Sequence, residues 1–146
     1  MTISVHNRQR ALRVRLPWLR RFAEVALDRC GGHSADGLFA LCALGEVEVS
    51  IISDRAIAEV HRRFMNIRGP TDVITFEHGE IVMSAQTAEQ YAARYGQPLE
   101  HELALYIIHG LLHLNGYEDG TPREAARMRR LQERLLQACL RAGPPL

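Results

Sequence analysis

The chain has 146 residues, of which 47% are hydrophobic and 24% are charged, and its net charge at neutral pH is +1. This composition is that of a globular protein and excludes a disordered chain or one that binds polyanions through net charge alone. No apolar run approaches the roughly 18 residues of a membrane span, and the N-terminal segment lacks the apolar core of a signal peptide. We therefore expect one cytoplasmic domain over residues 1–146.

The basic residues are all arginines and are unevenly distributed. Residues 1–30 carry seven arginines against Glu24 and Asp28, whereas residues 31–60 carry Arg55 against five acids. Arginine suits phosphate recognition, although a genome-wide preference for arginine is the simpler explanation. The three cysteines are odd in number and form no CxxC pair, which indicates reduced thiols in or near the core.

Hydrophobic periodicity predicts an alternation of strands and helices. In chain order, we expect a strand over 2–7, a helix over 17–30, a strand over 46–53, a helix over 54–66, strands over 71–76 and 80–84, and helices over 84–96, 98–115 and 122–142. Ser53 or Asp54 is placed to cap the second helix, and Gly69-Pro70 ends it. This order indicates an α+β or mixed α/β fold.

The stretch HGLLHLNGYED, residues 109–119, contains the pattern HxxxHxxGxxD. Residues four apart share one helix face, so His109 and His113 can direct two imidazoles to one ion. Gly116 can adopt the left-handed conformation that ends a helix, which would bring Asp119 back toward the histidines. Three protein ligands with one open position are typical of a catalytic zinc site.

The same spacing occurs in metzincin proteases, whose motif is H-E-x-x-H-x-x-G-x-x-H. In those enzymes the glutamate after the first histidine is the general base. This chain has Gly110 at that position. The spacing therefore predicts a zincin-like metal site without the protease base.

HGLLHLNGYED resembles the HGxLHLxGYDH signature of the YbeY family of bacterial metal-dependent, single-strand-specific endoribonucleases. PTDVITF (70–76) and GEIVMS (79–84) resemble that family's PTDVLSF and GDIVIS. The resemblance implies an α+β fold, with a small mixed sheet of about four strands packed with about five helices and a zincin-like metal site. It also implies a cytoplasmic enzyme that matures the 16S rRNA 3′ end and acts in ribosome quality control. Its partners would be single-stranded RNA and the small ribosomal subunit.

The family's first two metal ligands correspond to His109 and His113, and its third, usually histidine, corresponds to Asp119. A carboxylate is an acceptable zinc ligand, but two histidines and a carboxylate also suit iron or manganese. We expect one Zn²⁺ per chain, with another divalent metal as the alternative. An aligned family arginine is replaced by Met65, and Arg63 and Arg68 flank that position.

Several further side chains are candidates for roles around this site. Glu118 is a candidate proton-transfer group, and Arg63 and Arg68 are candidate phosphate contacts, although a solvated surface role suits each of them as well. Asp72 is expected to orient the loop before its strand, and Tyr117 to pack against the helix. The remaining histidines named here are expected to be surface or packing residues: His61, His78 and His101.

Two other classes of function remain compatible with the sequence. One is a metallopeptidase-like hydrolase that uses a distant carboxylate as its base. The other is a metal-stabilised ribosome-binding factor with little catalysis, which the replacement of the family arginine by Met65 favours.

Overall fold

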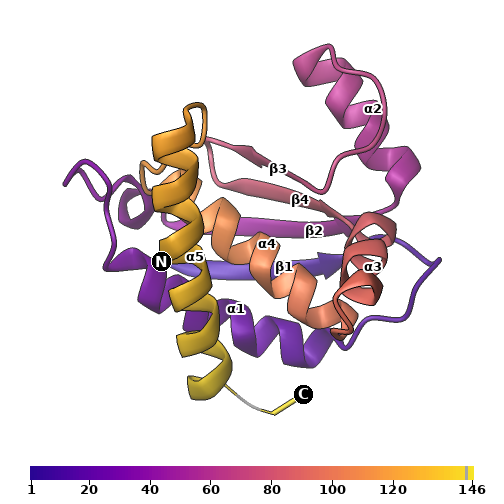
Figure 1. The fold of residues 1–146 in the computed structure, drawn as a ribbon, viewed down its shortest axis with the longest axis horizontal. Helices are drawn as coiled ribbons and strands as arrows, with labels where there is room; N and C mark the ends of the chain where they lie inside the picture. Colours follow the sequence, from indigo (N-terminus) through magenta and orange to yellow (C-terminus); the bar gives the residue numbers. More distant parts are fainter. Residues whose placement is uncertain (144) are drawn as a thin grey trace.

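The structure is a computed structural model that describes residues 1–143 and 145–146. Its elements are β1 (Thr2–Asn7), α1 (Leu16–Gly31), the 3-10 helix η1 (Ala40–Ala43), β2 (Glu46–Ile52), α2 (Asp54–Met65), β3 (Val73–Phe76), β4 (Glu80–Ser84), α3 (Ala85–Arg94), α4 (Leu99–Leu114) and α5 (Pro122–Ala142) (Figure 1). The strands and α-helices predicted from the sequence are all present, with ends shifted by no more than two residues. The 3-10 helix was not predicted.

The four strands form one mixed sheet in the order β1-β2-β4-β3. β1, β2 and β4 are parallel, and Val5 lies opposite Val49 in the register of the first pair. β3 runs antiparallel to β4 at the sheet edge, because only three residues join the two strands and so short a connection permits only antiparallel pairing. Gly79 in this connection has φ +107° and thus the left-handed conformation that the turn requires.

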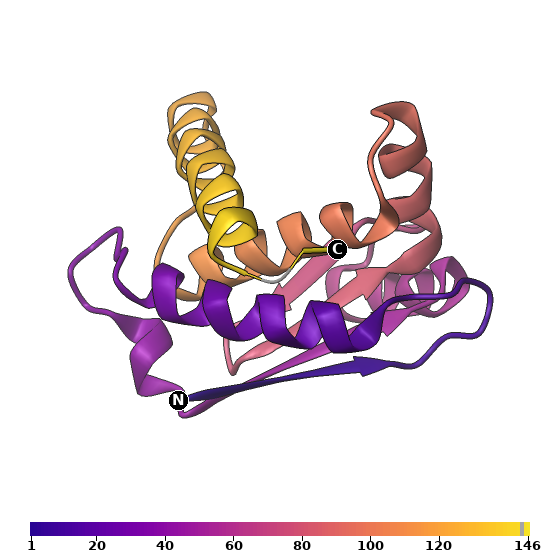
Figure 2. The same cartoon turned by 90° about the horizontal axis from the view of Figure 1, so that it is seen from below.

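α1, α3, α4 and α5 lie on one side of the sheet (Figure 2), and α2 packs on part of the other face. Alternate residues of β4 separate the two faces: Ile81 packs in the main core with α1, α4 and α5, whereas Val82 packs in a smaller cluster with Ile57 of α2. α4 lies centrally and is buried on most of its surface. Within the described residues, no helix is both long and apolar enough to cross a membrane.

Asn115 fixes the end of α4 and is fully buried. Its side-chain amide donates hydrogen bonds to the carbonyl oxygens of Cys30 (3.1 Å) and His33 (2.7 Å), and its Oδ1 accepts one from the backbone N–H of Leu41 (3.3 Å). Its own carbonyl accepts from the N–H of Ala35 at 3.2 Å. One asparagine thereby joins the loop after α1 and the 3-10 helix to the helix that carries both histidines.

The three cysteines are free thiols, as predicted. Cys30 and Cys139 are buried in the main core. Cys42 differs from the expectation, because it is exposed on the 3-10 helix.

Candidate metal centre

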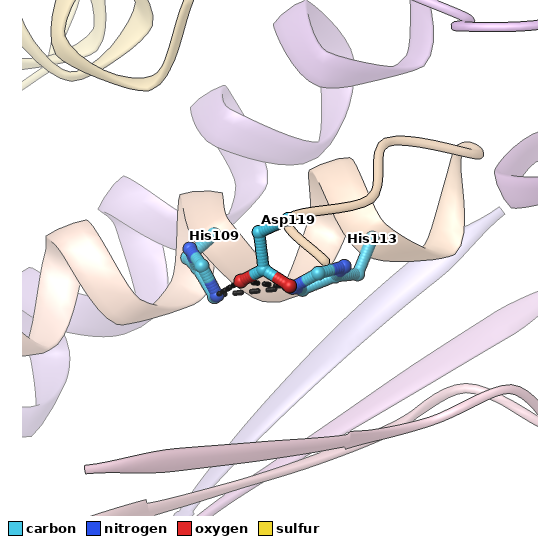
Figure 3. Close-up of side chains that lie close together, drawn as sticks. All are labelled: His109, His113 and Asp119. Carbon is cyan, nitrogen blue, oxygen red and sulfur yellow. Dashed lines mark hydrogen bonds and ion pairs between the residues drawn. The ribbon is translucent and has the colours of Figure 1, made fainter. Parts of the chain in front are cut away.

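Two residues of α4 and one from the loop after it bring their side chains to one point (Figure 3). The Nε2 atoms of His109 and His113 lie 3.0 Å apart. Asp119 Oδ2 lies 3.8 Å from His109 Nε2 and 3.5 Å from His113 Nε2. The structure thus brings together the three residues that the sequence pattern selected.

The return of Asp119 depends on the turn at Gly116. Gly116 has φ +98°, and the N–H of Tyr117 donates to the carbonyl of Leu112 at 3.0 Å, so the chain folds back over the last helical turn. A Cβ atom at position 116 would lie 3.1 Å from Asp36 Oδ2. The left-handed backbone conformation favours glycine here, and a side chain would also have to displace the carboxylate of Asp36.

Both imidazoles are oriented through their second nitrogen. His109 Nδ1 lies 2.8 Å from Gln132 Oε1, and His113 Nδ1 lies 2.8 Å from the carbonyl oxygen of Tyr117. These oxygens only accept hydrogen bonds, so each Nδ1 carries the proton and donates it. The Nε2 atom of each ring is then left with a free lone pair, which is the form that binds a metal.

Burial also favours the neutral form of His109. Desolvation lowers the pKa of its imidazole below the usual value of 6.5, and the hydrogen bond to Gln132 and the nearby Asp119 only partly oppose this shift. The ring is therefore uncharged at neutral pH. A neutral imidazole does not repel a cation.

The three donor atoms fit a small divalent ion. With mutual separations of 3.0, 3.5 and 3.8 Å, they share a common point about 2 Å from each, which matches zinc–nitrogen and zinc–oxygen bond lengths. Two unprotonated nitrogens 3.0 Å apart repel each other unless a cation lies between them. The separations of the three donor atoms and the tautomers of the two imidazoles therefore both fit a metal centre formed by His109, His113 and Asp119.

Gly110 has no room for the side chain that a zincin protease places there. A Cβ atom at this position would lie 2.6 Å from Cδ1 and 2.9 Å from Cγ1 of Ile81, because α4 packs closely on β4. Contacts this short cannot be accommodated without movement of the helix or of Ile81. The fold therefore supplies no glutamate base beside His109.

The candidate metal centre lies in a cleft of about 920 Å³. The cleft is bounded by α4, the turn after it, all of β3 and the end of α2. Phe64 and Met65 of α2 line it, with 63% and 51% of their surface exposed. The ring of Phe64 packs edge-to-face on that of Phe76, 5.4 Å between centroids, so one wall of the cleft is aromatic.

Of the three other predicted site residues, Glu118 lines the cleft, whereas Arg63 and Arg68 do not. Glu118 is exposed and lines the cleft beside Asp119. Arg63 and Arg68 are exposed, but neither is among the described residues that line the cleft. Met65, which the sequence resemblance aligns with a family arginine, does line it with an apolar side chain.

Asp72 and Tyr117 behave as predicted. Asp72 Oδ1 accepts a hydrogen bond from the N–H of Val73 at 2.8 Å and orients the start of β3. Tyr117 is buried, with the guanidinium of Arg127 above its ring at 5.0 Å.

Two other residues lie at the site although the sequence did not place them there. His61, expected to be a surface or packing residue, lines the cleft, and its Nδ1 lies 3.0 Å from the carbonyl oxygen of Gly69. Gln132 orients His109 from a different helix, 23 residues along the chain. No spacing rule links a glutamine on one helix to a histidine on another, so the sequence offered no signal for it.

Comparison with known proteins agrees with this geometry. A family model described as Endoribonuclease YbeY matches residues 4–140. The chain belongs to the YbeY family. A Mycolicibacterium smegmatis protein named Endoribonuclease YbeY is 33% identical, over 94% of this chain and 82% of its own length.

Other YbeY relatives match a shorter segment. The Mycobacterium leprae protein of the same name is 39% identical over 63% of this chain, and the match spans 62% of that protein's length. For the Myxococcus xanthus protein the values are 38% identity, 62% of this chain and 35% of the relative. The solution structure of a Thermotoga maritima protein superposes with a TM-score of 0.65 at 24% identity, covering 95% of this chain and 89% of that one, which supports the same fold.

Proposed function

We propose that this chain is a metal-dependent endoribonuclease that cuts single-stranded RNA, acting as a single YbeY-like domain. The observation that carries the proposal is the convergence of two histidine Nε2 atoms and one carboxylate in an open cleft. Membership of a family whose model is described as Endoribonuclease YbeY supports the RNA substrate. The close contact between position 110 and Ile81 argues against peptidase chemistry.

His109, His113 and Asp119 would hold one divalent metal, and we propose Zn²⁺ as the first candidate. When bound, such a metal acts as a Lewis acid on a phosphoryl oxygen and eases deprotonation of an attacking hydroxyl group. Gln132 and the Tyr117 carbonyl keep both rings in the tautomer that leaves Nε2 free. Asp119 adds a negative charge that a third histidine would not add. This charge would make the bound metal a weaker Lewis acid.

We propose that Glu118 handles the proton that the reaction releases. Its carboxylate is exposed and lines the cleft beside Asp119. Either nucleophile, a water molecule or the ribose 2′-OH, must lose a proton, and a carboxylate oxygen at this place can accept it. Arg63 and Arg68 would then contact phosphates outside the cleft rather than the scissile group.

The aromatic wall of the cleft supports a single-stranded substrate. Phe64 presents an exposed ring, held edge-to-face by Phe76. Unpaired bases stack on such rings, whereas a duplex keeps its bases stacked on one another. A base next to the scissile phosphate would therefore bind against Phe64.

The wider role that we propose is maturation of the 16S rRNA 3′ end and ribosome quality control in the cytoplasm, with the small ribosomal subunit as partner. The support for this role is the resemblance of PTDVITF and GEIVMS to the corresponding YbeY segments. Residues 71–76 of the first segment line the cleft, and the second segment forms β4, which pairs with β3.

The proposal is tested by incubating the purified chain with an unstructured RNA and, separately, with casein, in the presence of Zn²⁺ or Mn²⁺. We expect the RNA to be cut, the casein to stay intact, and cutting to be lost in His113→Ala. Cleavage of casein with intact RNA would support a peptidase instead. RNA that is bound but not cut by metal-loaded protein would support a ribosome-binding factor.

A further inference from the structure

Apart from the metal that we propose, the cleft has little to attract an RNA backbone. Four carboxylates line it, and the described lining residues include no arginine or lysine: the acids are Asp72, Glu77, Glu118 and Asp119. Met65 stands where the family has an arginine, so a positive charge is missing here. Proteins bind RNA largely by neutralising phosphates with basic side chains. The basic residues that bind the strand must therefore lie outside the cleft.

A second hollow, of about 590 Å³, is basic, and Tyr117, which precedes the cleft residues Glu118 and Asp119, lines it. Three arginines of α5, Arg127, Arg130 and Arg134, line it, and we call them the arginine ridge. His33 also lines it, and Glu133 is its one carboxylate among the described residues. With residues at positions i, i+3 and i+7, the ridge follows one face of α5 over about 10 Å.

The ridge arginines are not neutralised by the protein. Within the described part of the chain, none of the three forms an ion pair, in contrast to Arg8 with Glu48 (3.1 Å) and Arg62 with Glu59 (2.7 Å). All three are exposed. Three unpaired guanidinium groups around one hollow repel each other, and an anion relieves that repulsion.

The arginine ridge and the candidate metal centre both contact the turn at Tyr117. Arg127 stacks over the ring of Tyr117 at 5.0 Å, while the carbonyl oxygen of Tyr117 accepts the hydrogen bond from His113. Tyr117 lines the ridge hollow, and the next two residues, Glu118 and Asp119, line the cleft. α5 packs beside α4 (Figure 1). It also carries Gln132, whose Oε1 lies 2.8 Å from His109 Nδ1.

We propose that the arginine ridge binds backbone phosphates of the same RNA strand whose scissile phosphate lies in the cleft. The inference rests on the proposed function and extends it, because it names the path of the strand past the Tyr117 turn. Guanidinium groups hold phosphates through paired N–H donors and read no sequence, so the ridge adds affinity without base preference. An acidic protein is the competing occupant of this surface.

The test compares two variants of the full chain that lose the same charge. In the ridge variant, Arg127, Arg130 and Arg134 are changed to Gln; in the control, Arg21, Arg129 and Arg141 are changed to Gln, all exposed and outside the hollow. Arginine and glutamine have similar helix propensity, and circular dichroism melting checks that both variants fold. Affinity for a labelled unstructured 12-nucleotide RNA is measured by fluorescence anisotropy with EDTA, which prevents cutting, over a range of salt concentrations.

We expect the ridge variant to lose roughly 100-fold in RNA affinity at 0.1 M salt. The slope of log K against log salt should become shallower by about 2, because each of the three phosphate contacts to a single strand contributes about 0.7. The control should lose far less. Changing the three ridge residues to Lys should keep most of the slope.

Equal losses in the ridge variant and the control would overturn the inference, because net charge would then account for binding. Unchanged RNA affinity in the ridge variant would also overturn it and leave the surface to an acidic protein. Neither result touches the proposed function, which is judged by cutting of RNA with metal present. Failure to cut RNA would overturn the proposed function, while the binding measurement in EDTA would still report on the ridge.

Discussion

The Nε2 atoms of His109 and His113 face each other at 3.0 Å, while both Nδ1 atoms donate hydrogen bonds to carbonyl oxygens. With each Nδ1 protonated, neither Nε2 can donate a hydrogen bond to the other ring unless its own ring becomes positively charged. The carboxylate of Asp119 completes a triangle of electron-pair donors. This arrangement is held by the fold and costs free energy that a bound cation repays.

Gln132 is expected to support metal binding without touching the metal. Gln132→Leu removes the acceptor for His109 Nδ1 and frees the ring to turn or change tautomer. Loss of such a partner typically lowers metal affinity about 10- to 100-fold. Competition with a fluorescent zinc chelator measures this affinity. Gln132→Glu keeps an acceptor and should retain most of the metal affinity. Gln137→Leu, at an exposed position of α5, is the matched control. Equal metal affinity in Gln132→Leu and wild type would show that His109 needs no such partner.

Asn115 is expected to be a main contributor to stability at the end of α4. Asn115→Ala leaves two backbone carbonyls and one N–H without their partner in a fully buried place. We expect the free energy of unfolding to fall by about 2–4 kcal/mol, since each buried group left unpaired costs about 1–3 kcal/mol. Urea denaturation measures the change. Gln90→Ala on the exposed face of α3 should change stability little, and a similarly small effect of Asn115→Ala would contradict the anchoring role.

Phe64 is expected to contribute to RNA binding but not to folding. Its side chain is 63% exposed, so Phe64→Ala should leave the melting temperature almost unchanged. Stacking of one base on an aromatic ring is worth about 1–3 kcal/mol, so affinity for single-stranded RNA should fall roughly 5- to 150-fold. Anisotropy titration with EDTA measures it. Tyr95→Ala, 67% exposed and outside the cleft lining, is the control; equal effects of the two changes would argue against a base on Phe64.

The metal-free protein is expected to lose stability as the pH falls below 6.5. Burial lowers the pKa of His109 in the folded state below its ordinary value of 6.5, so the unfolded chain takes up a proton that the folded one resists. Between the two pKa values the unfolded state binds more protons, and stability therefore decreases as pH falls. Urea unfolding with EDTA at pH 7.5 and 5.5 measures the decrease, which should be smaller in His109→Gln.

Groups that do not interact with His109 contribute equally in both proteins and cancel in this comparison. Glu102 acts in the opposite direction, because burial raises the pKa of its carboxyl group. The same pH dependence in wild type and His109→Gln would contradict the assignment to His109.

Most of the fold follows from local patterns in the sequence. Thr121 and Pro122 set the start of α5, and the alternation of residues 2–7 sets β1. Ser53 caps α2 by accepting a hydrogen bond from the N–H of Ala56, as its position predicted. The 3-10 helix at Ala40–Ala43 was missed, because four residues show no period and their position depends on the bond between Asn115 and Leu41.

The candidate metal ligands were accessible to sequence reasoning for a similar reason. His109, His113 and Asp119 belong to one helix and the turn that follows it, so their spacing alone determines that they can meet. Gln132 and His61 reach the site from other helices, and only the packing of α5 on α4 and of α2 beside β3 brings them there. The arginine ridge is visible in the sequence as a basic helix, but its nearness to the Tyr117 turn is not.

Metal content is the most direct measure of the central claim. The chain is purified, stripped with EDTA, reloaded with excess Zn²⁺, desalted and analysed for zinc per chain, beside His109→Ala and His113→Ala. The account predicts one zinc per wild-type chain and much less than one in either variant, with folding retained because both side chains lie at the cleft surface. Wild-type protein that holds no stoichiometric metal under these conditions, or variants that hold as much as wild type, would contradict it.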